Sequence, residues 1–178
     1  PEIVEVTDPK WQGAVEGVLR GYTSVILLDK ASDASAAYRI GEKQRYSHFI
    51  VPDRILAPVV KDSSLLSVVS FNAKAPAWLI EQLQRIETVD SIDQGMKIHK
   101  SLEWITPDAY HFERRGGRSL FVEVSRYRFG NAGRTQRLEA LQKALPRLQS
   151  QEDQLTIQIS KLAGEISHLW LAFRVPPY

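Results

Sequence analysis

The sequence contains no cysteine, which excludes disulfide bonds, cysteine-ligated zinc sites and thiol catalysis. It also lacks an apolar run near the ~18 residues that a membrane-spanning helix needs, and no signal-peptide pattern opens the chain. We therefore expect a cytoplasmic protein with no membrane partner. The chain begins at Pro1 without an initiator methionine, so we expect an excised segment or a processed product.

The motifs of common catalytic sites are missing as well. There is no P-loop and no GxSxG nucleophile elbow, and the four histidines show no HxH or HxxxH pairing. Asp108 followed by Glu123 resembles the acidic spacing of a metal-dependent nuclease, but Ser125 stands where such sites use a lysine. We predict no catalytic residue, no metal site and no cofactor, and expect that this chain is not an enzyme by itself.

A long heptad repeat dominates the C-terminal part of the chain. With Leu138 at position a, ten of the eleven a and d positions up to Phe173 are apolar, and Glu152 is the exception. Such a seam predicts a helix that packs in a coiled coil with a strand outside this chain, or alternatively one that folds onto its own domain. Pro146 should kink or break this helix. The seam residues are Leu138, Leu141, Leu145, Leu148, Leu155, Ile159, Leu162, Ile166 and Leu169.

Positive charge is concentrated just before this repeat. Residues 114–137 hold seven arginines and one acid, Glu123, while the rest of the chain has a charge of −4. Such a segment either attracts phosphate backbones or is only a solvated basic surface. The arginines at its centre are Arg114, Arg115, Arg118, Arg126 and Arg128.

The remaining sequence alternates short strands and helices. We predict strands at 3–6, 25–28, 49–51, 87–89, 103–106 and 119–129, and helices at 11–19, 34–45, 77–85 and 92–100. Asp8 is the expected N-cap ahead of Pro9, and Ser32 or Asp33 the cap of the second helix. Phe49–Asp53 resembles Trp104–Asp108, 55 residues later, which indicates an internal duplication or a coincidence of five residues.

In their order, these segments resemble the hinge domain of SMC proteins. The resemblance rests on a helix with Trp11, Ala14, Glu16 and Leu19, a strand ending in Asp29, the two Pro-Asp strand ends, and Arg115-Gly116-Gly117. The opening helix looks closest to the SMC-like ATPase subunit of bacterial Wadjet (JetC-type) and MukB-like systems.

The resemblance implies an α/β fold of two pseudo-repeated lobes followed by a long coiled-coil helix. It implies a homodimer formed through the hinge, with Gly116 and Gly117 at the interface, and a parent ATPase that acts on DNA in chromosome or plasmid maintenance or in anti-plasmid defence. Its location would be nucleoid-associated. The missing N-terminal coiled-coil strand of the same protein would cover the seam. DNA is a candidate partner, and the five central arginines would contact it.

We expect a two-lobed domain over residues 1–133, with lobes at about 1–58 and 59–133, an arm segment at 134–173 and a tail at 174–178. A rival hypothesis is a coiled-coil adaptor that binds a protein partner without nucleic acid. The e and g positions of the arm are nearly uncharged, so they supply few ion pairs to select a partner. This favours the hinge hypothesis over the adaptor hypothesis, because a coiled-coil strand of the same protein is held nearby by the chain and needs few ion pairs to select it.

Overall fold

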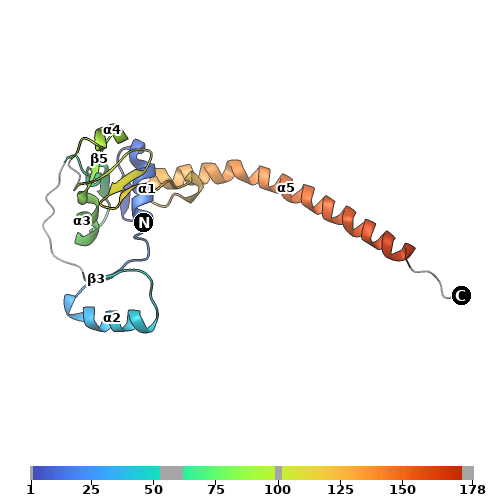
Figure 1. Ribbon diagram of the computed structural model, residues 1–178, viewed down its shortest axis with the longest axis horizontal. Coiled ribbons are helices and arrows are strands. Elements are labelled where there is room, and N and C mark those ends of the chain that lie inside the picture. The colour runs from blue at the N-terminus through green and yellow to red at the C-terminus, as the bar shows by residue number, and fades with distance from the viewer. Residues whose placement is uncertain (1, 53–61, 99–101, 174–178) are drawn as a thin grey trace. The chain divides into compact units, whose positions relative to one another are not determined.

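The computed structural model describes residues 2–52, 62–98 and 102–173, and the chain divides into two units, Pro1–Arg137 and Leu138–Tyr178 (Figure 1). The strands are β1 (Val4–Val6), β2 (Ile26–Leu28), β3 (Ile50–Pro52), β4 (Val69–Phe71), β5 (Ile86–Thr88), β6 (Glu103–Ile105), β7 (Tyr110–Glu113) and β8 (Gly116–Ser119). The helices are α1 (Gln12–Arg20), α2 (Ala34–Lys43), α3 (Ala77–Arg85), α4 (Ile92–Gly95) and α5 (Gly130–Ala172). Short 3₁₀ turns include η1 (Pro9–Trp11), η3 (Leu65–Val68) and η4 (Val124–Arg126).

A helix–strand–helix–strand order occurs twice in the first unit. The first copy is α1, β2, α2, β3 and the second is α3, β5, α4, β6. The two strands of each copy are parallel neighbours, with Leu27 opposite Val51 and Glu87 opposite Trp104. Parallel strands need a crossover connection, and α2 and α4 provide it. The predicted duplication is therefore confirmed at the level of element order.

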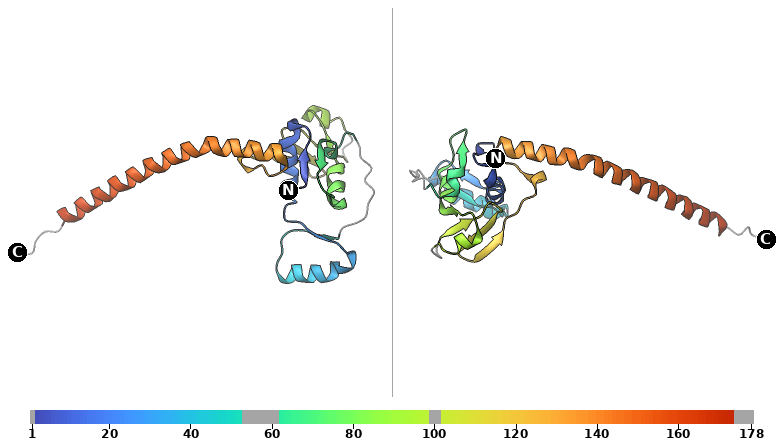
Figure 2. Two further views of the ribbon diagram at one scale, coloured as in Figure 1. Left: turned by 180° about the vertical axis from the view of Figure 1, so that it is seen from behind. Right: turned by 90° about the horizontal axis from the view of Figure 1, so that it is seen from above.

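One hydrophobic core joins α1 to the second copy. α1 follows an N-cap at Asp8, whose carboxylate accepts a hydrogen bond from the Lys10 N–H at 3.0 Å, as predicted. The apolar face of α1 packs with α3, β5 and β6, and these elements lie together in every view (Figure 2). β1 pairs with β4, which the sequence did not predict. The buried core residues include Val4, Trp11, Ala14, Val15, Val18, Leu19, Leu65, Leu83, Ile86, Ile105 and Phe129.

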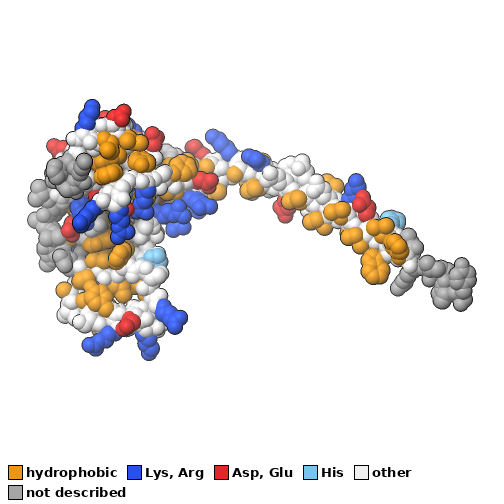
Figure 3. Space-filling view, in the orientation of Figure 1, with side chains coloured by type: hydrophobic (Ala, Val, Ile, Leu, Met, Phe, Trp, Pro, Cys, Tyr) orange, Lys and Arg blue, Asp and Glu red, His pale blue; other side chains and the backbone are white. Residues whose placement is uncertain are grey.

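The segment β2–α2–β3 has no fully buried residue of its own. Its large apolar side chains include Ile40 and Phe49, which are 62% and 71% exposed. Figure 3 shows hydrophobic side chains gathered over this segment. α2 ends two residues before the expected Arg45, because Arg45 adopts a left-handed backbone with φ of 52°. The crossing expected at 54–61 lies outside the described residues.

The strand predicted at 119–129 is wrong. β8 ends at Ser119, and the chain then forms η4 at Val124–Arg126. The backbone N–H groups of Arg128 and Phe129 do not pair with a strand, because the Glu16 carboxylate accepts their hydrogen bonds. The predicted helix at 92–100 is also too long, since α4 ends at Gly95, which packs directly on the Trp104 ring; residues 99–100 are outside the described part.

α5 is one helix of 43 residues that continues through Pro146. The expected break is therefore absent, and Figure 1 shows gentle curvature over the second unit in place of a sharp bend. Residues 174–178, the expected tail, lie outside the described residues.

Candidate functional site

The hairpin β7–β8 carries the first group of predicted site residues. β8 is an edge of the four-stranded sheet β5-β6-β7-β8, and Arg114 and Arg115 form the exposed hairpin turn. Gly116 has φ of +124°, which a residue with a Cβ rarely adopts. A Cβ on Gly117 would lie 2.5 Å from the Tyr110 hydroxyl oxygen. Both glycines therefore have roles within this chain, whatever they do at an interface.

Arg118 is exposed on β8, where its Nε lies 3.6 Å from a carboxylate oxygen of Glu113. A pair this exposed contributes at most a fraction of a kcal/mol, roughly 0–1, so it does not prevent Arg118 from binding an anion.

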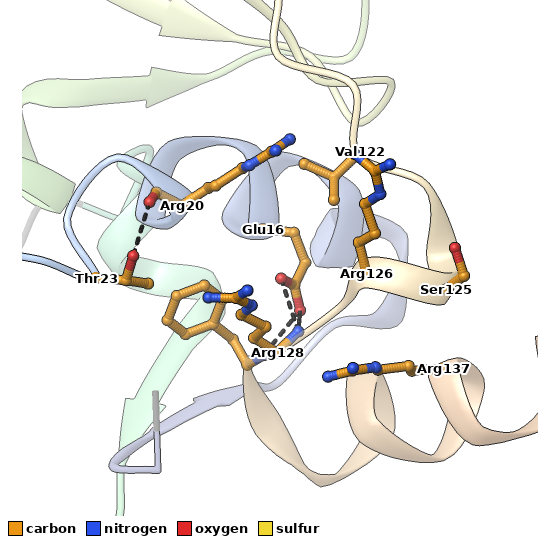
Figure 4. Close-up of a pocket in the computed structure, with 9 residues that line it drawn as sticks. Glu16, Arg20, Thr23, Val122, Ser125, Arg126, Arg128 and Arg137 are labelled. Carbon is orange, nitrogen blue, oxygen red and sulfur yellow. Dashed lines mark hydrogen bonds between the residues drawn. The ribbon is translucent and has the colours of Figure 1, made fainter. Parts of the chain in front are cut away.

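Arg126 and Arg128 lie apart from the hairpin turn, at a cavity of about 380 Å³ (Figure 4). Arg20 of α1 and Arg137 of α5 line the same cavity. The structure thus brings together four arginines from α1, η4, the segment after η4 and α5 (Figure 4). Sequence reasoning selected Arg126 and Arg128 but missed Arg20, which lies 106 residues before Arg126 and carries no local signal.

Glu16 forms the buried wall of this cavity and is 2% exposed. Its carboxylate accepts hydrogen bonds from the N–H of Arg128 at 2.8 and 2.9 Å, from the N–H of Phe129 at 2.8 Å and from Gln12 Nε2 at 3.1 Å. Burial raises the pKa of Glu16, and the donors at Phe129 and Arg128 oppose that shift only in part. These bonds attach the start of α5 to α1.

Further contacts hold the first turn of α5. The Asn131 N–H donates to Glu5 Oε2 at 2.7 Å, and Gln12 Nε2 donates to the Phe129 carbonyl oxygen at 3.0 Å. Gly130 has φ of +71°, and a Cβ on Gly133 would lie 2.5 Å from Gln12 Nε2. Glycine is thus required where the arm leaves the compact domain.

A second cavity, of about 510 Å³, lies between α1, α3 and the sheet. Arg20 lines both cavities, and Arg118 and Arg85 line this one, so the basic surface extends from the hairpin to the start of α5. His111 also lines it and is 6% exposed, and neither of its ring nitrogens has a hydrogen-bond partner in the described part of the chain. Burial lowers the pKa of His111.

The seam of α5 is exposed along its length. Each of the nine seam residues is between 43% and 66% exposed. A contiguous apolar stripe of this length is normally covered by a partner helix.

Residues 2–52, 62–98 and 102–173 contain neither a candidate metal site nor a candidate membrane-spanning helix. No group of three or more histidine, aspartate or glutamate side chains there is placed to hold a metal ion. No helix in these ranges is long and apolar enough to cross a membrane.

Comparison with known proteins places the fold. No protein-family model and no curated protein sequence matches the chain. Among solved structures, it is similar to the Pyrococcus furiosus Smc hinge domain with an extended coiled coil, with a TM-score of 0.51 and 16% identity over 96% of this chain. The chain spans 65% of that structure's length. A Geobacillus stearothermophilus SMC hinge dimer structure gives a TM-score of 0.48 at 14% identity, over 94% of this chain and 73% of that one.

The predicted fold class is therefore confirmed: the chain has an α/β, SMC-hinge-like fold with small sheets and a long C-terminal helix. At 16% identity the likeness concerns the fold alone.

Proposed function

We propose that this chain is the hinge module of an SMC-like, DNA-processing ATPase, in which two copies associate through their α/β domains and so join two coiled-coil arms. One observation carries the proposal: a long helix with an exposed heptad seam follows a domain with the SMC-hinge fold. The ATPase would reside elsewhere in the parent protein. More specifically, we propose that the parent protein is of the Wadjet (JetC-type) or MukB-like type.

The exposed apolar surface of β2–α2–β3 supports association through the α/β domain. Ile40 and Phe49 lie in a segment without fully buried residues, and exposed apolar surface of this kind is typical of an interaction site. The exposed edge of β8, with Gly116 and Gly117, is the second candidate surface, because it presents backbone groups free to approach another chain closely.

The proposed partner of the α5 seam is the strand of the same protein that precedes this segment. The seam repeats every seven residues, which suits a left-handed coiled coil. Its nearly uncharged e and g positions suit a partner that is delivered by tethering.

Association can be tested in the full chain by light scattering after gel filtration over a wide concentration range. Two matched variants each replace two exposed apolar residues by glutamine: Ile40→Gln/Phe49→Gln on the α/β domain, and Leu148→Gln/Leu155→Gln on the seam. We expect the wild-type chain and the seam variant to be dimers and the domain variant to be a monomer. A monomeric seam variant beside a dimeric domain variant would mean that the helix does the joining, and would favour the adaptor hypothesis.

We propose that DNA phosphates are contacted by Arg114, Arg115, Arg118, Arg126 and Arg128. DNA binding should therefore weaken as the salt concentration rises. Replacing Arg114, Arg115 and Arg118 with glutamate should abolish DNA retention at low salt and leave the thermal unfolding curve unchanged. The matched control reverses three exposed charges on α5 outside the seam: Lys143→Glu/Arg147→Glu/Lys161→Glu. Equal binding by wild type and hairpin variant would remove the hairpin from the proposed interface.

A further inference from the structure

The residues that line the four-arginine cavity include four basic side chains and one acidic side chain, Glu16. In the part of the chain that the structure describes, the guanidinium groups of Arg20, Arg128 and Arg137 form no ion pair and no hydrogen bond. Arg126 has only an exposed contact of 3.9 Å with Glu123. Arg20 of α1, Arg128 after η4 and Arg137 of α5 thus present unpaired N–H donors to one cavity (Figure 4).

Glu16 does not neutralise these arginines in the way a salt-bridge partner would. Both of its carboxylate oxygens already accept backbone hydrogen bonds from Arg128, and one also accepts from Phe129 and Gln12. No hydrogen bond or ion pair joins Glu16 to an arginine guanidinium group within the described residues. Glu16 is therefore the one acidic side chain among the lining residues of the cavity, which include four arginines.

We propose that this cavity binds a terminal phosphate group, as found on a small phosphorylated compound or at the end of a nucleic-acid strand. Guanidinium groups bind phosphate through paired, charge-assisted hydrogen bonds, and a doubly charged terminal phosphate accepts more of them than a backbone phosphodiester. The volume of about 380 Å³ accommodates such a group, whereas a duplex is too wide to enter it and would lie over the exposed hairpin. This site shares Arg126 and Arg128 with the proposed DNA surface, and Arg20 and Arg137 are its additional arginines.

The position of the cavity gives the ligand a structural consequence. Arg20 belongs to α1, Arg126 to η4 and Arg137 to the first turns of α5. A phosphate held by all three would connect α1 to the start of the arm, beside the Glu16 hydrogen bonds that already do so. Bound phosphate should therefore slow amide hydrogen exchange over residues 126–137.

The test titrates inorganic pyrophosphate into the full chain by calorimetry at low salt. The variant is Arg20→Gln/Arg137→Gln, and the matched control, Lys143→Gln/Arg147→Gln, removes the same charge from exposed positions away from the cavity. We expect one pyrophosphate per chain, affinity weakened at least about tenfold in the cavity variant and less than about twofold in the control. The cavity variant should unfold at the same or a higher temperature at low salt, because it removes repulsion among like charges.

Binding is then compared for two oligonucleotides of one sequence, one with a 5′-phosphate end and one with a 5′-hydroxyl end. The comparison distinguishes a nucleic-acid end from a small phosphorylated compound as the ligand. Tighter binding of the phosphorylated strand, with displacement by pyrophosphate, would identify a nucleic-acid end. Pyrophosphate binding with no difference between the strands would identify a small compound. Absence of pyrophosphate binding, equal weakening by both variants, or exchange protection confined to segments other than α1 and 126–137 would each overturn the proposal.

Discussion

The carboxylate of Glu16 accepts two hydrogen bonds from the backbone N–H of Arg128, at 2.8 and 2.9 Å, across 112 residues of sequence. It accepts a third from the N–H of Phe129. A side chain thus provides what a neighbouring strand would provide elsewhere, and it does so where the arm begins. A buried carboxylate is stabilised by the hydrogen bonds that it accepts, and Glu16 accepts them from three donors, the third being Gln12 Nε2.

Replacing Glu16 by alanine should destabilise the compact domain by roughly 2–4 kcal/mol, because two buried N–H groups lose their acceptor and a cavity opens. Urea unfolding of the full chain, followed by far-UV circular dichroism, measures the free energy of unfolding. Glu42→Ala, at an exposed position on α2, is the control and should change it by less than about 0.5 kcal/mol. Similar losses in both variants would contradict the anchoring role.

Replacing Gly17 by alanine should cost about 1–3 kcal/mol, because the new Cβ would lie 2.5 Å from the carbonyl oxygen of Leu120 and 2.8 Å from its Cβ. Gly164→Ala is the matched control in α5, where nothing lies within 4 Å, and it should stabilise the helix by up to about 1 kcal/mol. Thermal unfolding of both variants compares the two. An unchanged unfolding temperature in Gly17→Ala would show that α1 can move away from Leu120, the residue after β8, at little cost in free energy.

The contribution of His111 to the stability of the domain should fall as the pH drops below about 6.5. Burial lowers the pKa of His111 from its ordinary value of 6.5, while Glu103 and Glu113 oppose that shift and Arg118 adds to it. The unfolded state then binds the proton more strongly than the folded state, so stability is full above the unfolded pKa and decreases as the pH falls toward the folded one. Urea unfolding at pH 7.5 and pH 5 should show a smaller decrease in His111→Phe than in wild type. A decrease of the same size in both would assign the effect to other groups.

Replacing Pro146 by alanine should stabilise the middle of α5, because proline removes one backbone hydrogen bond and crowds the preceding turn at a cost of about 3 kcal/mol. Amide exchange over residues 140–150 should slow, while Lys143→Ala, an exposed change three residues away, should leave it nearly unaltered. If exchange is already slow in wild type and does not change, the helix accommodates the proline without local weakening.

The repeated order of helices and strands was predictable because its signals are local. The spacing of apolar residues in 77–85 matches α3 residue for residue, and Asp8 before Pro9 marks the cap that the structure contains. The α5 helix follows in the same way from its heptads. The strand expected at 119–129 does not form, although basic and apolar residues alternate at its end: Tyr127 and Phe129 are buried, and Arg126 and Arg128 are exposed.

The arginine cavity was only half predictable. Arg126 and Arg128 belong to a visible cluster of charge, but Arg20 reaches the cavity because α1 packs against the segment that leads into α5. Likewise, Gly17 and Glu16 are ordinary helix residues until Leu120 and Arg128 are placed beside them.

The sequence by itself determined the elements with internal periodicity: the repeated order of helices and strands, and a long helix with a heptad seam. Tertiary structure alone decided which distant groups meet, including the β1–β4 pair, the Glu16 anchor and the four-arginine cavity. The physical reason is that periodicity reports burial one residue at a time, whereas a hydrogen bond or a shared cavity depends on distances between segments, and packing sets those distances only after the chain has folded.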